Sequence, residues 1–464
     1  MNKSFGILYI ILFFIQGSLH GQNQGSSFNT EESRSTIIYG FIRGGLYGSL
    51  DDADDKPYVS SAFSDFSLKA ETRDYRHFKA FTDLRFRYGT EFLEPVKRVD
   101  LREVYVKING KKWDLTAGQT ILKWGRTDFS NPTSKLNPQN YITRSPDNED
   151  MDLGNLLADL KIYPAPVLSL EAVAVPFYRS SVLLIDPLPL PAWVNINQIN
   201  QLLTGKEMFT YGLKAEFHLS GTDMSISWFD GYDPMPGAAL TNFNLDMSGS
   251  IPVPYAELTM TPYKLRNIGI DFETTFGNFG LRGEAAWSFP YKSYKKEEYV
   301  PCEELKYNAG IDWMTGNWHF TAEYSGKTIT DYEAMAVDPI IGTEPDPAKL
   351  AQMMADPGFD LNEYVRQQVA AFNRLYNYQI ERTYHSAGFR MEREMLYGKL
   401  TPSVFAVYNF TSRDFILMPE IKYKPADGLT ISAGGDYYSG KKGSINDLVN
   451  EFMNCIRIAV KVDF

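Results

Sequence analysis

The sequence predicts an all-β protein, a transmembrane antiparallel β-barrel of about 18 strands with a range of about 16 to 18. In the last ten residues Ile456, Ile458, Val460 and Val462 alternate with mostly charged residues, so a strand there has one apolar and one polar face. Aromatic residues make up 14% of the chain, including 29 Tyr and 30 Phe. Barrels place such rings where lipid headgroups meet water. Turns alternate between short and long along the chain, which is typical of a barrel with short periplasmic turns and long extracellular loops.

The C-terminal alternation continues to Phe464, the last residue of the sequence. A terminal Phe on such a strand resembles the assembly signal of bacterial outer-membrane barrels. It implies that the outer-membrane assembly machinery recognises this strand. The alternative is an edge strand in a soluble β-sandwich, which uses the same alternation.

The N-terminus has the pattern of a secretory signal peptide. Lys3 precedes an apolar run from Phe5 to Ile15, and the small residue Gly21 marks the expected cleavage site. We therefore expect a signal peptide at 1–21, a flexible periplasmic leader at 22–36 and the barrel at 37–464. No later stretch of 18 or more apolar residues is present, which excludes transmembrane helices from the mature part. Export to the outer membrane of a Gram-negative cell follows from this interpretation.

Composition excludes several classes of protein. The formal net charge is −11, which argues against a nucleic-acid partner. The two cysteines, Cys302 and Cys455, are too few for a disulfide scaffold or a zinc module, and a bridge between them is left open.

The clearest internal strand runs from Phe78 to Tyr88. One face carries Phe78, Leu84 and Phe86, while charged residues occupy the other, which suits a water-filled lumen. The other expected strands lie at 37–47, 62–72, 99–108, 113–122, 158–162, 168–177, 209–219, 224–232, 264–276, 281–289, 305–314, 318–328, 387–396, 399–410, 415–423, 429–438 and 455–464.

The inward face of these strands supplies candidates for a solute path. The densest positive group lies between residues 79 and 87, and two further pairs lie on later strands. The candidates are Lys79, Asp83, Arg85, Arg87, Glu103, Lys107, Arg282 and Glu284. Rings of such charges can select solutes; alternatively, they pair across strands and stabilise the wall.

Two loops are candidates for narrowing the bore. Trp124, Arg126 and Asp128 lie where a strand leaves the membrane for a long loop. Trp124 is expected in the interface belt, while Arg126 and Asp128 are expected to pin the loop across the mouth. Packing on the rim without solute contact is the alternative.

A helical loop insert is expected at about 346–378, with a first helix at 347–355 and a second from about 361 to 378. It is either a lid or a helical loop on the rim. Outer connections are expected to be long, except at Thr411–Arg413.

Catalytic chemistry is not indicated. The five histidines share no metal-ligand spacing, and no short serine-nucleophile motif occurs, so we expect no catalytic residue, cofactor or metal. His218 and His319 each lie two or four residues from a glutamate on the same inward face, and they keep a barrel-wall hydrolase as the third hypothesis.

A series of short motifs runs through residues 99–290: Arg102-Glu103-Val104-Tyr105, Gly118-Gln119, Trp124-Gly125-Arg126, Asn137-Pro138, Gly231-Tyr232-Asp233-Pro234 and Arg282-Gly283-Glu284. The series resembles a family of poorly characterised porin-like outer-membrane β-barrel proteins without a settled substrate, some of which are thought to accompany lipid-exporting systems. The resemblance implies location and architecture more than cargo.

The sequence therefore predicts a porin-like channel for passive or facilitated passage of small solutes, or of hydrophobic or lipid cargo, across the outer membrane. A non-conducting surface-exposed barrel for binding, adhesion or envelope assembly is the alternative. Outer-membrane lipid is an expected partner, and whether the barrel forms a homo-oligomer is left open.

Overall fold

The computed structural model describes residues 36–50, 56–72, 77–185, 187–199, 202–205, 208–246, 253–295, 297–341 and 352–464. Residues 36–464 form one compact unit. The predicted signal peptide and the leader up to residue 35 lie outside the described residues.

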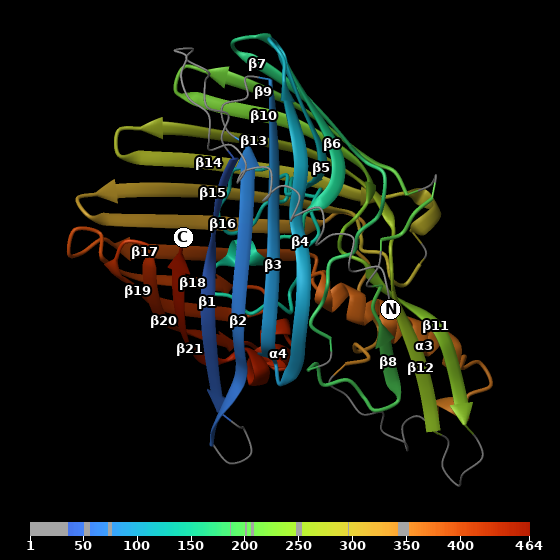
Figure 1. Ribbon diagram of the computed structural model, residues 1–464. Helices are drawn as coiled ribbons and strands as arrows, with labels where there is room; N and C mark the ends of the chain where they lie inside the picture. Colours follow the sequence, from blue (N-terminus) through green and yellow to red (C-terminus); the bar gives the residue numbers. More distant parts are fainter. Residues whose placement is uncertain are drawn as a thin grey trace, which may run out of the picture. The chain divides into compact units, whose positions relative to one another are not determined.

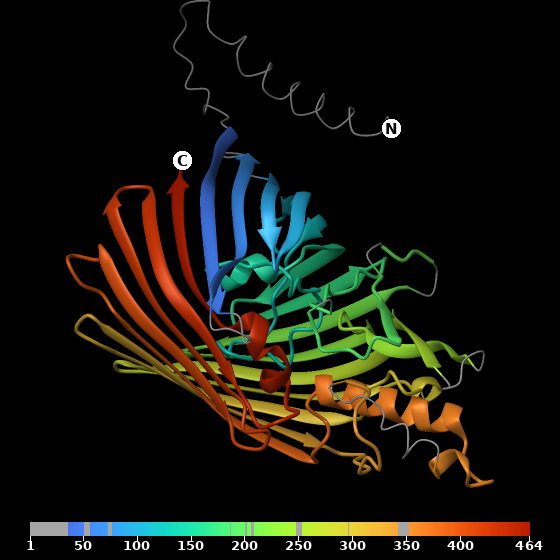
Figure 2. The same cartoon turned by 90° about the horizontal axis from the view of Figure 1, so that it is seen from below.

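A closed antiparallel barrel of 18 strands forms the body of this unit, as predicted (Figures 1 and 2). It closes because β1 pairs with both β2 and the C-terminal β21. The strands are β1 (Thr36–Leu50), β2 (Pro57–Thr72), β3 (Phe78–Glu91), β4 (Glu94–Asn109), β5 (Trp113–Thr120), β6 (Asn155–Ala165), β7 (Leu168–Val175), β9 (Thr210–Leu219), β10 (Thr222–Tyr232), β13 (Lys264–Phe276), β14 (Phe279–Pro290), β15 (Glu304–Thr315), β16 (Trp318–Ile329), β17 (Thr383–Arg393), β18 (Leu400–Asn409), β19 (Phe415–Ala426), β20 (Leu429–Ser439) and β21 (Cys455–Asp463).

Alternation along each strand decides which side chains face inward. On β21, Ile458 is 50% exposed on the outer surface, whereas Arg457 is 8% exposed on the inside. On β3, Tyr88 is 72% exposed and Asp83 only 1%. The predicted faces of both strands are confirmed, and the outer surface is the apolar one that lipid contacts favourably.

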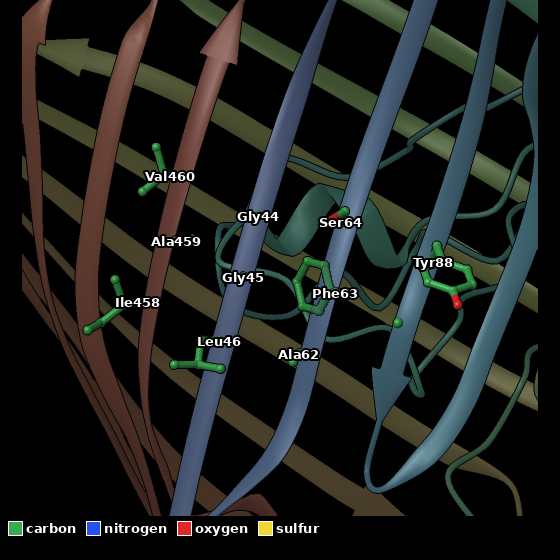
Figure 3. A pocket seen from close by; sticks show the side chains of 11 residues that line it. Gly44, Gly45, Leu46, Ala62, Phe63, Ser64, Tyr88, Ile458, Ala459 and Val460 are labelled. Carbon is green, nitrogen blue, oxygen red and sulfur yellow. The ribbon is translucent and has the colours of Figure 1, made fainter.

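The outer surface has a shallow hollow at the seam where the barrel closes. Its volume is about 510 Å³, and small residues on β1 and β2, including Gly44 and Ala62, form its floor (Figure 3). Leu46, Ile458 and Val460 flank it. The hollow is an apolar feature of the outer wall, separate from the interior.

One outer connection is shorter than predicted. The sequence suggests a loop between β3 and β4, but the strands continue to a two-residue turn at Phe92 and Leu93. Both residues have positive φ, 49° and 68°, a conformation that apolar residues rarely adopt. The turn is held in place because the Phe92 N–H donates to Ser61 Oγ at 3.0 Å and the Leu93 N–H donates to the Ser60 carbonyl at 2.9 Å.

Long connections build a small cap beyond the strand ends. A three-stranded sheet of β8 (Val194–Asn197), β12 (Val253–Thr261) and β11 (Gly237–Asp246) packs with helix α3 (Leu361–Tyr376) around a shared apolar core (Figure 1). The core includes Leu258, Ile340 and Val369. The alternation of apolar and polar residues along a strand gives no information about long-range packing of this kind, so the sheet was not predicted.

The second predicted helix of the insert is confirmed as α3, and the Asp360 carboxylate accepts N–H bonds from Asn362 and Glu363 at its start. The first predicted helix, 347–355, lies mostly outside the described residues. A further helix, α4 (Ile445–Met453), was missed, and two short 3₁₀ segments occur at Asn148–Met151 and Lys292–Tyr294. Within the described ranges, no helix is both long and apolar enough to cross a membrane.

Candidate solute path through the barrel

The long connection between β5 and β6, residues 121–154, folds into the barrel, and we call it the inward loop. Its residues contact the inner wall at β13, β16, β18 and β19 and, across the bore from β13, at β1 and β3. A loop held on both sides narrows the open cross-section of a barrel.

Two wall carboxylates hold the first part of the inward loop. Glu284 on β14 accepts the N–H of Thr133 at 2.7 Å and its hydroxyl at 2.8 Å, and it also accepts the Thr127 hydroxyl at 2.9 Å. Glu323 on β16 accepts the N–H of Asp128 at 2.9 Å and of Phe129 at 3.2 Å. Hydrogen bonds to charged acceptors are among the stronger ones in proteins, so these carboxylates fix the loop backbone.

Arg126 fixes the same part of the loop through its side chain. Its guanidinium forms ion pairs with Glu216, with Asp271 at 2.7 Å and with Glu273 at 3.5 Å. Asp128 pairs with Arg282 at 2.6 Å. The first stretch of the inward loop is therefore bonded to β9, β13 and β14.

The far part of the inward loop is anchored by two aspartates. Asp150 pairs with Arg43 on β1 and with Arg85 on β3, both at 2.5 Å, and Asp147 pairs with Arg43 at 3.1 Å. Burial alone would raise the pKa of the Asp150 carboxyl, but the two guanidinium groups hold this pKa well below its usual range. Asp150 therefore stays ionised in the folded protein.

Phe129 lies at the part of the loop that meets β17 and β18. Its ring centroid is 4.9 Å from that of Phe405. The Arg390 guanidinium carbon lies 5.6 Å from the Phe129 ring and 5.4 Å from the Phe405 ring. Arg390 makes these cation–π contacts and, within the described part of the chain, forms no ion pair.

A polar cavity of about 610 Å³ lies beside the inward loop, inside the barrel. Aromatic and aliphatic side chains, among them Phe41, Phe405 and Met418, form part of its wall. Its cationic residues are Lys69, Arg85, Arg102, Arg390, Lys422, Arg457 and Lys461, and its carboxylate residues are Asp147, Glu149, Asp150, Glu392, Glu420 and Asp463. The cavity has both the size and the lining of a site for a small polar molecule.

The predicted solute-path residues fall in different places. Arg85 lines the cavity. Arg87 is buried in ion pairs with Asp65 at 3.0 Å and Glu91 at 2.7 Å, so it supports the wall. Lys79 pairs with Glu71 at 2.9 Å.

The remaining candidates make structural contacts of several kinds. Glu103 accepts the Thr120 hydroxyl at 2.9 Å, and Lys107 pairs with Asp114 at 3.2 Å. Asp83 accepts the Ser67 hydroxyl at 2.9 Å. Arg282 and Glu284 instead bind the inward loop, as described above.

Trp124 does not lie in the lipid interface belt, so that expectation is wrong. It is 2% exposed and packs inside, above Gly212, and its indole N–H donates to Glu171 at 3.2 Å. The reason is that the chain has already turned inward at this residue, and a wall glycine leaves room for the ring.

The two histidines of the hydrolase hypothesis have different partners. His218 Nε2 lies 3.4 Å from Ser169 Oγ, and His218 Nδ1 lies 3.1 Å from Asp223 Oδ1. His319 contacts Asp312 at 3.3 Å. In the described ranges no cluster of three or more His, Cys, Asp or Glu side chains could hold a metal ion, and Cys302 and Cys455 are free thiols.

Sequence reasoning missed part of this site. The Asp147 and Asp150 anchors lie in a stretch without periodicity, so nothing in the sequence placed them inside. Arg102 and Glu103 are consecutive and would be expected on opposite faces, but a β-bulge opposite Asp83 and Leu84 interrupts the alternation there.

Comparison with known proteins identifies the fold. No protein-family model and no curated protein matches the sequence. Among solved structures, OccAB2 of Acinetobacter baumannii is similar with a TM-score of 0.53 at 10% identity, covering 93% of this chain and 98% of that chain. OpdK of Pseudomonas aeruginosa with vanillate gives 0.52 at 9% identity, covering 93% and 98%. OccAB3 of A. baumannii gives 0.51 at 11% identity, covering 93% and 99%. At these identities the likeness is one of fold.

Proposed function

We propose that the protein is a porin-like channel of the outer membrane that passes small polar solutes through the lumen, beside the inward loop. The observation that carries this proposal is the cavity of about 610 Å³ beside a loop bonded to both sides of the bore. Similar solved structures are outer-membrane porins, which supports the same function. The finer resemblance to a porin-like family with the Arg102-Glu103-Val104-Tyr105 series is part of this proposal.

Arg390 and its aromatic neighbours point to a preference among solutes. Its guanidinium lines the cavity without a carboxylate partner in the described ranges, while Phe405 and Met418 supply apolar surface nearby. A small organic anion matches such a lining, because its negative charge can pair with Arg390 and its hydrocarbon part can pack against the apolar wall. The similar barrel OpdK was crystallised with vanillate, so vanillate is a reasonable first solute to test.

Liposome swelling tests the proposal. Liposomes with the refolded barrel are diluted into isotonic solutions of vanillate, arabinose or a large dextran, and the rate of swelling is recorded. We expect swelling with the two small solutes and none with dextran. Protein-free liposomes are the control, and an equal lack of swelling with all three solutes would contradict a channel.

A non-conducting surface barrel is the second candidate, and the cap favours it. β8, β11, β12 and α3 form a packed unit with its own apolar core outside the barrel, which a simple pore does not require. If swelling is absent although the barrel is folded, binding through the cap becomes the leading function.

A serine hydrolase is the third candidate, because Ser169, His218 and Asp223 lie in the order that a nucleophile, base and orienting carboxylate require. Ser169 is buried on the wall, however, which restricts access. A fluorophosphonate probe tests this directly: we expect no labelling, while labelling of Ser169 that is lost in His218→Ala would establish the site.

We propose that outer-membrane lipid surrounds and contacts the apolar outer face of the barrel. The assembly machinery is the proposed partner of the C-terminal strand. Phe464, which follows β21, exchanges backbone hydrogen bonds with Gly40 at 2.9 and 3.0 Å. A homo-oligomer is a further proposal, tested by chemical crosslinking in membranes. No nucleic acid is expected.

A further inference from the structure

A second, smaller polar cavity lies where the inward loop, the barrel wall and the cap meet, and we call it the junction cavity. Its volume is about 130 Å³. The lining includes Lys135 of the inward loop, Asp233 after β10, Ser288 of β14, Glu304 and Lys306 of β15, and Asn377 after α3. It is separate from the solute path proposed above.

The lysines at the junction cavity outnumber the carboxylates when Lys327, a further partner of the lining residue Glu304, is counted with the lining residues. Lys135 pairs with Asp233 at 2.8 Å, and Glu304 pairs with Lys306 at 2.6 Å and with Lys327 at 2.9 Å. Three lysine side chains thus share two carboxylates. Burial of an unbalanced charge is costly, so such a site requires a counter-charge or loss of a proton.

The hydrogen bonds show the same imbalance. Each of the four carboxylate oxygens already accepts a bond: those of Asp233 from Met235 N–H and Lys135, and those of Glu304 from Lys306 and from Lys327 with Gln379. An ammonium group has three N–H donors. Within the described ranges Lys135 and Lys306 each have a single hydrogen-bonding or ionic partner, which leaves donors facing the cavity.

The buried lysine of the inward loop stays charged. Burial opposes protonation of Lys135, but the Asp233 carboxylate raises its pKa above the usual range. The Ser288 hydroxyl, which accepts a bond from Asn267 at 2.7 Å, still has its own hydrogen to donate. The cavity therefore offers N–H and O–H donors to a ligand.

We propose that the junction cavity binds one small monovalent inorganic anion, such as chloride, between Lys135 and Lys306. A cavity of about 130 Å³ holds such an ion with a few waters, since one water occupies about 30 Å³ of liquid. The anion joins the inward loop to the wall beside the cap, so it stabilises the loop in its bonded position. The site does not depend on whether the barrel conducts.

Thermal unfolding of the full barrel in detergent tests the anion site. The apparent midpoint is measured in sodium chloride and in sodium gluconate at equal ionic strength, because gluconate is too large for the cavity. We expect the midpoint to rise with chloride by on the order of 1–2 °C per tenfold increase above half-saturation. Lys306→Met should lose this rise, because it removes one of the two lysines that bind the anion. The variant should still fold, because Glu304 keeps Lys327 and Gln379 as partners. Lys424→Met, at an exposed position of β19, should keep the rise.

Bromide provides a direct readout that needs no variant. Crystals of the wild-type barrel grown in sodium bromide should show an anomalous peak in the junction cavity. A cavity without bromide, or a wild-type midpoint equal in chloride and gluconate, would overturn the proposal and mean that water alone fills the space. If Lys306→Met does not fold, the bromide experiment decides.

Discussion

The Glu284 carboxylate accepts both the backbone N–H and the hydroxyl of Thr133, at 2.7 and 2.8 Å. A residue of the barrel wall thus holds the backbone of the inward loop 151 positions earlier in the chain. This contact, together with the ion pairs of Arg126, sets how far the loop can extend into the bore.

Glu284→Ala should widen the path. Removal of the carboxylate leaves the Thr133 and Thr127 donors without their wall acceptor, and hydrogen bonds to charged groups each contribute about 1.5–3 kcal/mol. We expect a higher single-channel conductance and a lower unfolding midpoint. Glu94→Ala at the exposed end of β4 is the matched control. An unchanged conductance in a folded Glu284→Ala barrel would show that the inward loop does not limit the current.

Arg390→Gln should reduce any preference for anions. Arg390 lines the cavity and forms no ion pair among the described residues, so its loss lowers the local positive potential. The reversal potential in a salt gradient should move toward cation selectivity. Arg393→Gln on the same strand, where the guanidinium lies over the Trp318 ring, serves as the control. Equal shifts of the reversal potential in both variants would show that Arg390 is not part of the solute path.

Ile458→Arg should destabilise the membrane-inserted barrel by about 2–4 kcal/mol, because it places a charge on the lipid face. Lys461→Glu reverses a charge on the cavity wall and should alter selectivity with little effect on folding. Denaturant titration in lipid vesicles measures both. If the two variants fold equally well, the assignment of inner and outer faces is wrong.

Acid should weaken the far anchor of the inward loop. The folded-state pKa of Asp150 is depressed by Arg43 and Arg85, so its contribution is fully present above the unfolded pKa of about 3.9 and is lost as the pH falls toward the folded value. Wild type should lose stability below about pH 5. Asp150→Asn should cost about 3–5 kcal/mol at neutral pH, since it breaks a buried pair, and should show a shallower acid dependence. Melting curves over this pH range give both quantities; identical acid profiles would contradict the role of Asp150.

The barrel was largely predictable from the sequence, because the alternation of polar and apolar residues within a strand identifies that strand and its two faces. On β21, apolar Ile458 faces outward and charged Arg457 faces inward. The local alternation of polarity is enough to predict both orientations without knowledge of distant contacts. The Phe92-Leu93 turn was not predictable, because the hydrogen bonds that hold these positive-φ apolar residues come from Ser60 and Ser61 of β2, about 30 positions earlier.

The candidate site was less accessible to sequence reasoning. Arg126 was identified as a loop residue, but its carboxylate partners lie on β9 and β13, about 90 and 145 positions later. Arg390 is one of many inward charges, and only the structure shows that Phe129 and Phe405 flank it in place of a carboxylate. Non-local contacts decide which charged residue neutralises another, and strand periodicity carries no information about them.

Single-channel recording of the wild-type barrel in a planar bilayer tests the central claim most directly. If solutes pass beside the inward loop, the refolded protein should give discrete, steady openings, and a small organic anion added to one side should reduce the current by occupying the cavity. A barrel that is folded by heat-modifiable gel mobility yet gives no openings would contradict the account, because the inward loop and its anchors would then close the bore.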